Sequence, residues 1–213
     1  TKAGYTFGGW NANAAGTGTN YTVGQKYTSF TASTTVYAKW TANTYTVTYD
    51  GNGATGGSTA NSTHTYDVEK ALTANGYTRE YTVTYNYNGS GAANTQDKAT
   101  YTFKNWNTNA GGTGTKYTDK QVVENLTSTS NGTVKLFAQW NSDSVTLPTP
   151  TRSGYGFAGW YDAATGGNKV ADGGAVYTPT ANTTLYAHWT TNSYTVTYNY
   201  AENGGTEASK TSA

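Results

Sequence analysis

The chain lacks cysteine and methionine, and only three of its 213 residues are proline. Without cysteine it can form neither disulfides nor thiolate metal sites. Charged residues make up 12% of the chain and the formal net charge is +1, so no basic stretch is long enough to follow a phosphate backbone. No apolar run approaches the roughly 18 residues of a membrane-spanning helix. The sequence therefore predicts neither nucleic acid binding nor membrane insertion.

Aromatic residues are abundant, with 20 tyrosines and six tryptophans. All six tryptophans fall in a pair of short motifs that occurs three times. The first motif of the pair covers residues 5–10, 101–106 and 154–160, and the second covers residues 36–40, 136–140 and 184–189. A third motif, Tyr-Thr-Val-Thr-Tyr, stands at residues 45–49, 81–85 and 194–198. Self-similarity of this kind predicts a tandem array of small β modules.

The alternation within the second motif predicts which side chains form the core. Leu or Val, then Ala, then Trp share one face of the strand, and one tryptophan buries about 150–250 Å². The slot between Ala and Trp, held by Lys39, Gln139 and His188, is expected to face water. The predicted structural core consists of Trp10, Trp40, Trp106, Trp140, Trp160 and Trp189.

The motifs also predict how the chain divides. The first half of a module is defined as the Tyr-Thr-Val-Thr-Tyr strand together with the strand that returns after its turn. The second half is defined as the two tryptophan motifs. Residues 1–42 hold only a second half and residues 192–213 only a first half. Residues 80–141 hold both and are predicted to be a complete inserted module. Residues 43–79 and 142–191 would then be one module split by that insertion, which costs little because loop-closure entropy grows slowly with length.

Two details of this division stay open. If residues 45–49 paired with residues 5–10 and 36–40, the array would be permuted and not nested. Residues 67–72 are expected to form at most one helical turn.

The three motifs resemble the Listeria–Bacteroides repeat, which is related to the B repeats of internalin-type surface proteins. They are Tyr-Thr-Val-Thr-Tyr-(Asp/Asn), Leu-Pro-Thr-Pro-Thr-Arg-Ser-Gly-Tyr-x-Phe-x-Gly-Trp-Tyr and Leu-Tyr-Ala-x-Trp. The resemblance covers nearly the whole chain. It implies a mainly β fold of tandem β-grasp-like (ubiquitin-like) modules with at most one short helix each, in secreted or wall-attached bacterial proteins. The incomplete modules at residues 43–79 and 142–191 depart from a simple array.

No motif indicates a catalytic, cofactor or metal site. Residues 51–56 match the dinucleotide-binding fingerprint, but no helical pattern follows, so we predict a turn. The carboxylates show neither an acid–base spacing nor a calcium loop, and Asp162 and Asp172 support at most a sporadic site. His64 and His188 are interpreted as structural. Residues 147–151 superficially resemble a sorting signal but lack its glycine and hydrophobic tail.

The sequence thus predicts a non-enzymatic extracellular segment, a stalk, spacer or filament-forming part of a bacterial surface protein. The alternative is an adhesin module that binds host glycan or protein through exposed aromatic residues such as Tyr161. A hydrolase domain would need convergent titratable groups, and none is evident.

The ends of the chain raise a further expectation. Tyr194, Val196, Tyr198 and Tyr200 form an alternating apolar face that an open sheet edge would accept. One interpretation is that the chain is an excised piece of a longer array. The other is that this strand enters the incomplete first module of another copy, so that the partners are neighbouring repeats or copies of the chain joined head to tail.

Overall fold

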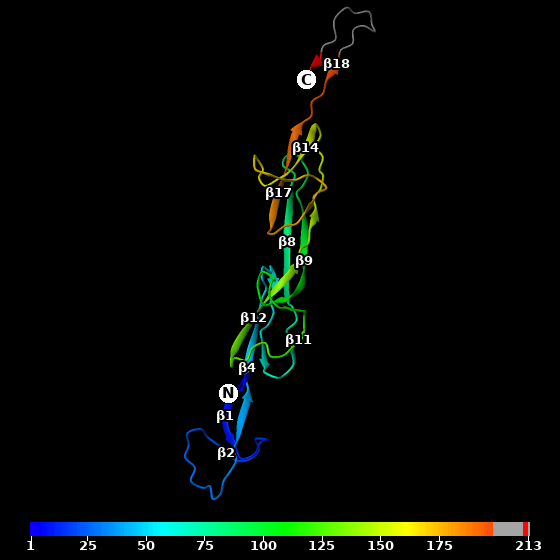
Figure 1. Cartoon of the computed structure of the whole chain (residues 1–213). Coiled ribbons are helices and arrows are strands. Elements are labelled where there is room, and N and C mark those ends of the chain that lie inside the picture. Colours follow the sequence, from blue (N-terminus) through cyan, green and yellow to red (C-terminus); the bar gives the residue numbers. More distant parts are fainter. Residues whose placement is uncertain (198–210, 213) are drawn as a thin grey trace, which may run out of the picture. The chain divides into compact units, whose positions relative to one another are not determined.

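The fold is mainly β (Figure 1). The chain divides into two compact units. The computed structural model describes residues 1–197 and 211–212, which form strands, turns and irregular segments but no helix. Unit 1 consists of Thr1–Arg79 and Tyr101–Asn141, and unit 2 of Glu80–Thr100 and Ser142–Ala213. Each unit therefore combines two separate pieces of chain, and the pieces alternate along the sequence.

Unit 1 is built around a mixed sheet. Its strands are β1 (Tyr5–Asn11), β2 (Asn20–Tyr21), β3 (Tyr37–Ala42), β4 (Thr44–Asp50), β5 (Gly56–Gly57), β6 (Ser62–Thr65), β7 (Lys70–Ala71), β10 (Lys116–Tyr117), β11 (Val122–Val123) and β12 (Gly132–Asn141). Two more strands, β8 (Tyr77–Asn86) and β9 (Thr95–Asn107), have residues in both units. β4 pairs antiparallel with β6 and parallel with β12, and β12 pairs antiparallel with β9. β1, β2 and β3 form a separate three-stranded sheet.

Unit 2 repeats the same order of strands. Its own strands are β13 (Val145–Thr146), β14 (Tyr155–Tyr161), β15 (Lys169–Ala171), β16 (Val176–Tyr177), β17 (Thr183–Thr191), β18 (Val196–Thr197) and β19 (Thr211–Ser212). β8 pairs parallel with β17, β17 pairs antiparallel with β14, and β14 pairs with β15. The path β15-β14-β17-β8 in unit 2 thus corresponds to β10-β9-β12-β4 in unit 1.

The pairing corrects the predicted division of the chain. Residues 43–79 combine with residues 101–141, and residues 80–100 combine with residues 142–191. The predicted insertion of a complete module at 80–141 is therefore wrong, because the first half at 43–79 pairs with the second half at 101–141, and the first half at 80–100 pairs with the second half at 142–191. The modules are interleaved, neither nested nor permuted.

The interleaving of the two units follows from the length of strands β8 and β9, which each continue from one unit into the other. β8 runs for ten residues and β9 for thirteen, and neither contains a glycine or proline. At about 3.3 Å per residue these strands extend roughly 33 and 43 Å without a turn. The Tyr81–Tyr85 motif therefore stays on the strand that leaves unit 1, and the chain reverses only after it, near Asn88 and Gly89, both of which have positive φ.

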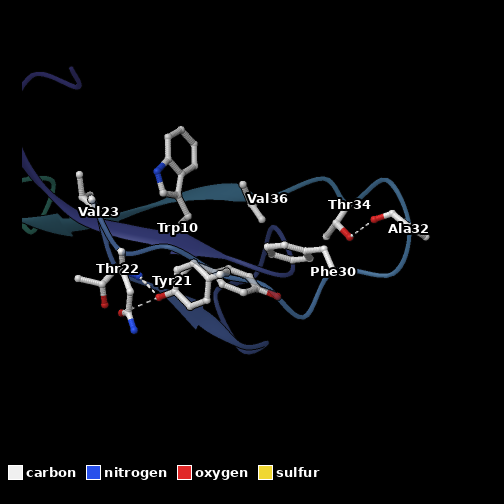
Figure 2. A pocket seen from close by; sticks show the side chains of 11 residues that line it. Trp10, Tyr21, Thr22, Val23, Phe30, Ala32, Thr34 and Val36 are labelled. Carbon is white, nitrogen blue, oxygen red and sulfur yellow. Dashed lines mark hydrogen bonds between the residues drawn. The ribbon is translucent and has the colours of Figure 1, made fainter.

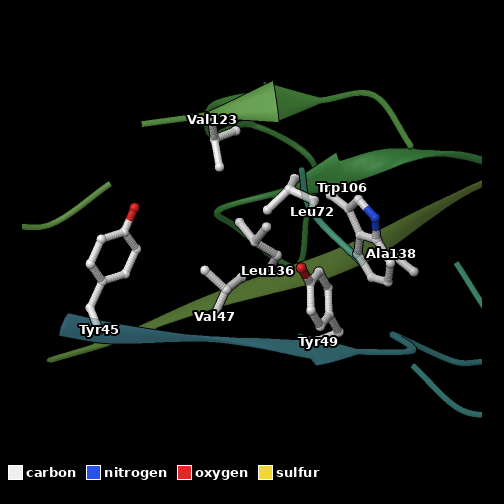
Figure 3. Packing of buried hydrophobic residues seen from close by; sticks show 8 residues of the cluster. All are labelled: Tyr45, Val47, Tyr49, Leu72, Trp106, Val123, Leu136 and Ala138. Carbon is white, nitrogen blue, oxygen red and sulfur yellow. The ribbon is translucent and has the colours of Figure 1, made fainter. Parts of the chain in front are cut away.

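The buried core of unit 1 lies between β4, β12 and the tryptophan at the end of β9 (Figure 3). In β4 the two tyrosines and the valine are buried while the threonines between them are half-buried, as the alternation of a strand requires. The core cluster consists of Tyr45, Val47, Tyr49, Leu72, Trp106, Val123, Leu136 and Ala138. First-half and second-half residues contribute together, so neither half has this core alone.

Unit 2 buries the equivalent side chains. They are Val83, Tyr85, Val145, Leu147, Trp160, Leu185 and Ala187, together with Ala99. The helical turn expected at residues 67–72 is absent, since Asp67 has a φ of 55°, and the chain passes from a turn directly into β7. A residue in the left-handed region does not continue a right-handed helix.

Candidate functional site

The chemically reactive side chains are engaged in structural contacts. His64 is buried, stacks on the Tyr45 ring at 5.4 Å, and has its Nε2 2.9 Å from Ser62 Oγ. Burial lowers the pKa of His64, and the positive charge of Lys70 lowers it further. His64 therefore forms part of the packing of the sheet core, with one face of its ring on Tyr45.

The slot that holds Lys39, Gln139 and His188 has a shared structural role. Each side chain is half-buried and hydrogen-bonds the loop that follows the first tryptophan motif. Lys39 Nζ donates to Asn20 Oδ1 at 3.4 Å, Gln139 Nε2 to the Ala110 carbonyl at 3.2 Å, and His188 Nε2 to the Ala163 carbonyl at 2.9 Å. The expectation that this slot faces open water is therefore only partly right. His188 also stacks on Tyr161 at 3.9 Å, so this tyrosine is half-buried.

The carboxylates singled out in the sequence also have structural partners. Asp162 accepts a hydrogen bond from the Asn168 backbone at 2.7 Å, which with the Asn168 side chain lowers the pKa of Asp162. Asp172 pairs with Lys169 at 2.6 Å. Residues 1–197 and 211–212 contain no group of three or more His, Cys, Asp or Glu placed to hold a metal ion. In the same part of the chain no helix is long and apolar enough to cross a membrane.

The feature that recurs in both units is the joint between a first half and a second half. In unit 1, Tyr49 of β4 meets the fully buried Trp106 with ring centroids 4.7 Å apart. In unit 2, Tyr85 of β8 meets the fully buried Trp160 at 5.2 Å. Burial and a hydrogen bond to Asp97 raise the pKa of the Tyr85 hydroxyl. The last tyrosine of the Tyr-Thr-Val-Thr-Tyr motif therefore covers the tryptophan of the opposite half.

An asparagine three residues after that tyrosine locks the joint. Asn52 and Asn88 both adopt positive φ, 46° and 44°, a conformation that asparagine tolerates better than most residues. Asn52 Nδ2 donates to the carbonyl of Ala138 at 2.8 Å and to that of Ala110 at 2.9 Å. Asn88 makes the same two bonds in unit 2, to Ala187 at 3.2 Å and Ala164 at 2.9 Å. We call this arrangement the asparagine clamp.

The sequence interpretation did not identify the clamp. Its signal was present, because Asn follows the last tyrosine by three positions in both copies, within Tyr-Asp-Gly-Asn and Tyr-Asn-Tyr-Asn. The second tryptophan of each half completes the joint. Trp140 Nε1 donates to the Gly51 carbonyl at 3.0 Å, and Trp189 Nε1 to the Tyr87 carbonyl at 3.2 Å.

The first repeat, residues 1–42, has the second half of this joint without a first half. Trp10 is 40% exposed, whereas Trp106 and Trp160 are 0% exposed. The prediction that all six tryptophans are largely buried is therefore wrong for Trp10, and Trp40, Trp140 and Trp189 are only half-buried. Trp10 retains its contact with Phe7 at 5.3 Å, but no described residue occupies the place of Tyr49 or Tyr85 against it. Among the described residues no first-half strand lies against Trp10, which accounts for its exposure in this structure.

Two hollows lie beside Trp10 where the first half packs in the complete modules. One has a volume of about 460 Å³ and is lined by Trp10, Tyr21, Phe30 and Val36 among others (Figure 2). The other, of about 540 Å³, lies against Phe7, Trp10, Ala38 and Trp40. Ala38 is exposed, whereas the equivalent Ala138 and Ala187 are fully buried.

The strand that borders these hollows is also shortened. β12 begins at Gly132, four residues before its Leu-x-Ala-x-Trp motif, and β17 begins at Thr183, two residues before its motif. These extra residues pair with β4 and β8. β3 begins only at Tyr37, within the motif itself. The residues just before Tyr37 form no strand and have no parallel partner among the described residues.

The predicted strand-exchange residues are described only in part. Tyr194 is 66% exposed and Val196 is 49% exposed, although the corresponding Tyr45 and Val47 are buried. β18 pairs antiparallel with β19. Tyr198 and Tyr200 lie outside the described residues.

Comparison with known proteins agrees with this repeated architecture. The model of the Listeria-Bacteroides repeat domain matches residues 1–39 and 125–188. The matched stretches, slightly under half of the chain, belong to the Listeria–Bacteroides repeat family. Internalin H of Listeria monocytogenes serovar 1/2a is 48% identical over 58 residues, which are 27% of this chain and 10% of that protein.

A second relative matches over nearly the whole chain. A protein of Evansella cellulosilytica named as a Gly-rich membrane protein is 27% identical over 238 residues, 98% of this chain. The chain spans 23% of the length of that protein, so both relatives are much longer than the segment described. No solved structure gives a significant match.

Proposed function

We propose that the chain is a non-enzymatic extracellular repeat segment that serves as a stalk or spacer of a bacterial surface protein. The observation that carries the proposal is the duplicated joint, in which the same tyrosine, asparagine and tryptophan contacts recur in both units. The carboxylates, by contrast, are used differently in the two units, since Asp172 pairs with Lys169 while Asp119 accepts a hydrogen bond from the Asn75 backbone. Repetition of packing without repetition of polar chemistry is typical of repeat architectures, whose neighbouring units share a core.

The interleaved connectivity supports a spacer. Domain boundaries ordinarily fall in flexible linkers rich in proline, glycine or polar residues. Here the chain passes between the units within β8 and β9, where glycine and proline are absent. Unit 1 needs residues 101–141, which follow residues 80–100 of unit 2, and unit 2 needs residues 80–100, which follow residues 1–79 of unit 1.

We also propose that the modules are related to the β-grasp fold. In support, each unit has a mixed sheet with two parallel central strands, β4 with β12 and β8 with β17, flanked by antiparallel neighbours. The described residues reach this arrangement without the short helix that the family resemblance implies.

A second candidate is an adhesin module that binds host glycan or protein. It is favoured by the cluster of aromatic rings in the first repeat, where Tyr21 lies 5.0 Å from Tyr27 and 5.4 Å from Phe30 beside the exposed Trp10. Aromatic faces in a shallow hollow can stack on sugars. The expected anchor Tyr161 is instead covered by His188.

Glycan-array screening of the intact chain separates the two candidates, with Trp10→Ala as the matched variant. The spacer proposal expects no reproducible binding in either protein. If the chain binds one class of glycan with micromolar affinity and Trp10→Ala abolishes this binding, the adhesin proposal would be supported and the spacer proposal rejected. In a positive test, the chain is displayed between a cell-wall anchor and an epitope. It should keep the epitope accessible to antibody, whereas a Trp106→Ala, Trp160→Ala double variant should be degraded on the surface.

A further inference from the structure

We infer that a small polar pocket in unit 1 binds a sugar acid, that is, a carboxylate that carries hydroxyl groups beside it. The pocket has a volume of about 180 Å³ and is lined by Lys104, Asn105, Lys116, Gln139 and Trp140 among others. Sites for drug-sized ligands occupy roughly 300–1,000 Å³, so this pocket takes a single small group or ring. The inference goes beyond the proposed function.

The pocket contains a buried polar group that no described residue satisfies. Asn105 is 9% exposed, and its Oδ1 has no hydrogen-bond partner among residues 1–197 and 211–212. Leaving a buried amide oxygen unpaired is unfavourable. An asparagine amide has an acceptor and a donor side, and a hydroxyl group can both donate and accept. Asn105 therefore provides a binding position for a hydroxyl group of a ligand.

This buried amide is peculiar to unit 1. The position directly before the buried or half-exposed tryptophan is held by Gly9 in the first repeat and by Gly159 in unit 2. Both glycines have positive φ, 107° and 127°, whereas Asn105 does not. A Cβ atom at Gly159 would lie only 2.5 Å from Lys169 Cε, so unit 2 has no room for a side chain here. The same place is therefore filled in unit 2 by its own lysine.

That lysine shows which group completes the site. Lys116 lies opposite Asn107, the residue after the buried tryptophan, and Lys169 lies opposite the corresponding Tyr161. Lys169 Nζ is 2.6 Å from Asp172 Oδ1. In unit 2 a carboxylate of the same chain therefore neutralises the lysine that corresponds to Lys116.

Unit 1 lacks that carboxylate. Thr118 takes the position of Asp172, because each of these residues accepts at its carbonyl the backbone hydrogen bond of the residue three positions later, at 3.2 and 3.4 Å. Within residues 1–197 the ammonium groups of Lys104 and Lys116 have no hydrogen bond or ion pair, and the neighbouring Asp119 pairs with neither. A carboxylate from outside the chain can therefore play the part of Asp172.

The other walls indicate a sugar acid and not a simple carboxylate. Trp140 Nε1 donates to the Gly51 carbonyl at 3.0 Å, which fixes the indole beside the pocket. Gln139 Nε2 donates to the Ala110 carbonyl at 3.2 Å, so the amide oxygen of Gln139 is left as an acceptor. A simple carboxylate would use the lysines alone, whereas the hydroxyl groups of a sugar acid also satisfy Asn105 and Gln139.

The site is expected to be weak. Both lysines are exposed, so water screens their charge. For a ligand the size of glucuronate, a typical binding energy per atom corresponds to a Kd on the order of 1 mM. Such binding is weaker than the micromolar level at which the glycan array separates spacer from adhesin, and Trp10 lies in a separate sheet. Where many copies stand side by side on a surface, several pockets can hold one polymeric acid by multivalency.

Titration of the intact chain with glucuronate, followed by NMR of the backbone and side-chain amides, tests the site. The Asn105 side-chain amide and the Gly111 and Gly112 backbone amides should shift and saturate. Glucose lacks the carboxylate and acetate lacks the hydroxyl groups, so each should bind about tenfold more weakly. A hyaluronan tetrasaccharide identifies the source, since binding as tight as that of glucuronate indicates a polymer and its loss indicates a free sugar acid. Both of these outcomes agree with the inference.

Two matched lysine variants separate the pocket from general surface charge. Lys116→Ala should weaken glucuronate binding about tenfold, since a hydrogen bond to a charged group contributes about that factor. Lys169→Ala removes the same charge from the equivalent place in unit 2 and should leave binding unchanged. Thr118→Asp supplies in unit 1 the carboxylate that Asp172 supplies in unit 2, so it should close the site and abolish binding. The amide spectrum itself reports whether each variant is folded.

Three results would overturn the inference. They are wild-type amides that do not respond to glucuronate at several times the expected Kd, equal shifts with acetate, which would indicate an adventitious ion only, and equal weakening in Lys116→Ala and Lys169→Ala. The wild-type titrations with glucuronate and acetate decide the matter if a variant fails to fold. A micromolar glycan whose binding Trp10→Ala abolishes would defeat the spacer function and leave this pocket unaffected.

Discussion

Replacing the central tryptophan of a complete joint should strongly destabilise unit 1, whereas the same change in the first repeat should have a smaller effect. Trp106 is fully buried, with Tyr49 4.7 Å and Phe103 5.0 Å from its ring centroid. Deleting a buried tryptophan side chain costs about 3–5 kcal/mol. Trp10 is 40% exposed, and for a ring that buries about 150–250 Å², the missing burial is worth roughly 2 kcal/mol at 25 cal/mol per Å². Trp10→Ala should therefore cost about 2 kcal/mol less than Trp106→Ala.

Hydrogen exchange measured by mass spectrometry resolves these effects by strand. In Trp106→Ala, amides of β4 and β12 should exchange about two to three orders of magnitude faster, because each 1.4 kcal/mol is a factor of ten. In Trp10→Ala, acceleration should be confined to β1 and β3. Equal protection losses in the two variants, or unchanged protection of β12 in Trp106→Ala, would show that the aromatic joint does not hold the unit together.

Four further changes test other parts of the structure. Asn52→Ala should destabilise unit 1 by about 1–3 kcal/mol in urea unfolding, and Asn52→Gly, which relieves only the positive φ, should recover a small part of that loss. Trp160→Phe should cost more than Trp106→Phe by thermal melting, because Trp160 Nε1 donates to the Pro148 carbonyl at 2.8 Å while the buried Trp106 Nε1 has no partner. Burial lowers the pKa of His64 in the folded state, so just below the ordinary histidine pKa of about 6.5 only the unfolded chain binds the extra proton. The free energy of unfolding of unit 1 should therefore be at its full value above that pH and should fall as the pH drops toward the folded-state pKa. His64→Phe should remove this pH dependence. Residues 80–141 in isolation should give no dispersed NMR spectrum, since their first half completes unit 2 and their second half completes unit 1; a cooperatively folded fragment would contradict the interleaving.

Local pattern predicted the strands well. The Tyr-Thr-Val-Thr-Tyr alternation specified β4 and the buried face of Tyr45, Val47 and Tyr49, because side chains on a strand alternate between its faces. The buried Leu, Ala and Trp positions of β12 followed from the same rule. These features depend only on residues within one strand, which a single sequence displays directly.

Pairing between halves was not predictable from motif identity. The Tyr-Thr-Val-Thr-Tyr strand is the same in all three first halves. The motif alone therefore does not identify the second half with which each strand pairs, and the sequence interpretation assigned the wrong partner to residues 43–79. Strand continuity held the missing information, since β9 runs through Ala99 and Tyr101 without a turn residue. The clamp asparagines were missed for a related reason. Asn is common in the turns of this chain, and only the contact with Ala138 or Ala187 distinguishes Asn52 and Asn88 from the rest.

The interchangeability of the halves has a consequence for assembly. Recognition between them rests on one tyrosine against one tryptophan, one asparagine against two carbonyls, and a parallel register fixed by a leucine or valine. None of these contacts depends on which part of the chain supplies the strand, as residues 43–79 and 80–100 demonstrate by completing second halves at different distances in sequence. What selects a partner is which strand the connecting backbone allows to reach the open edge.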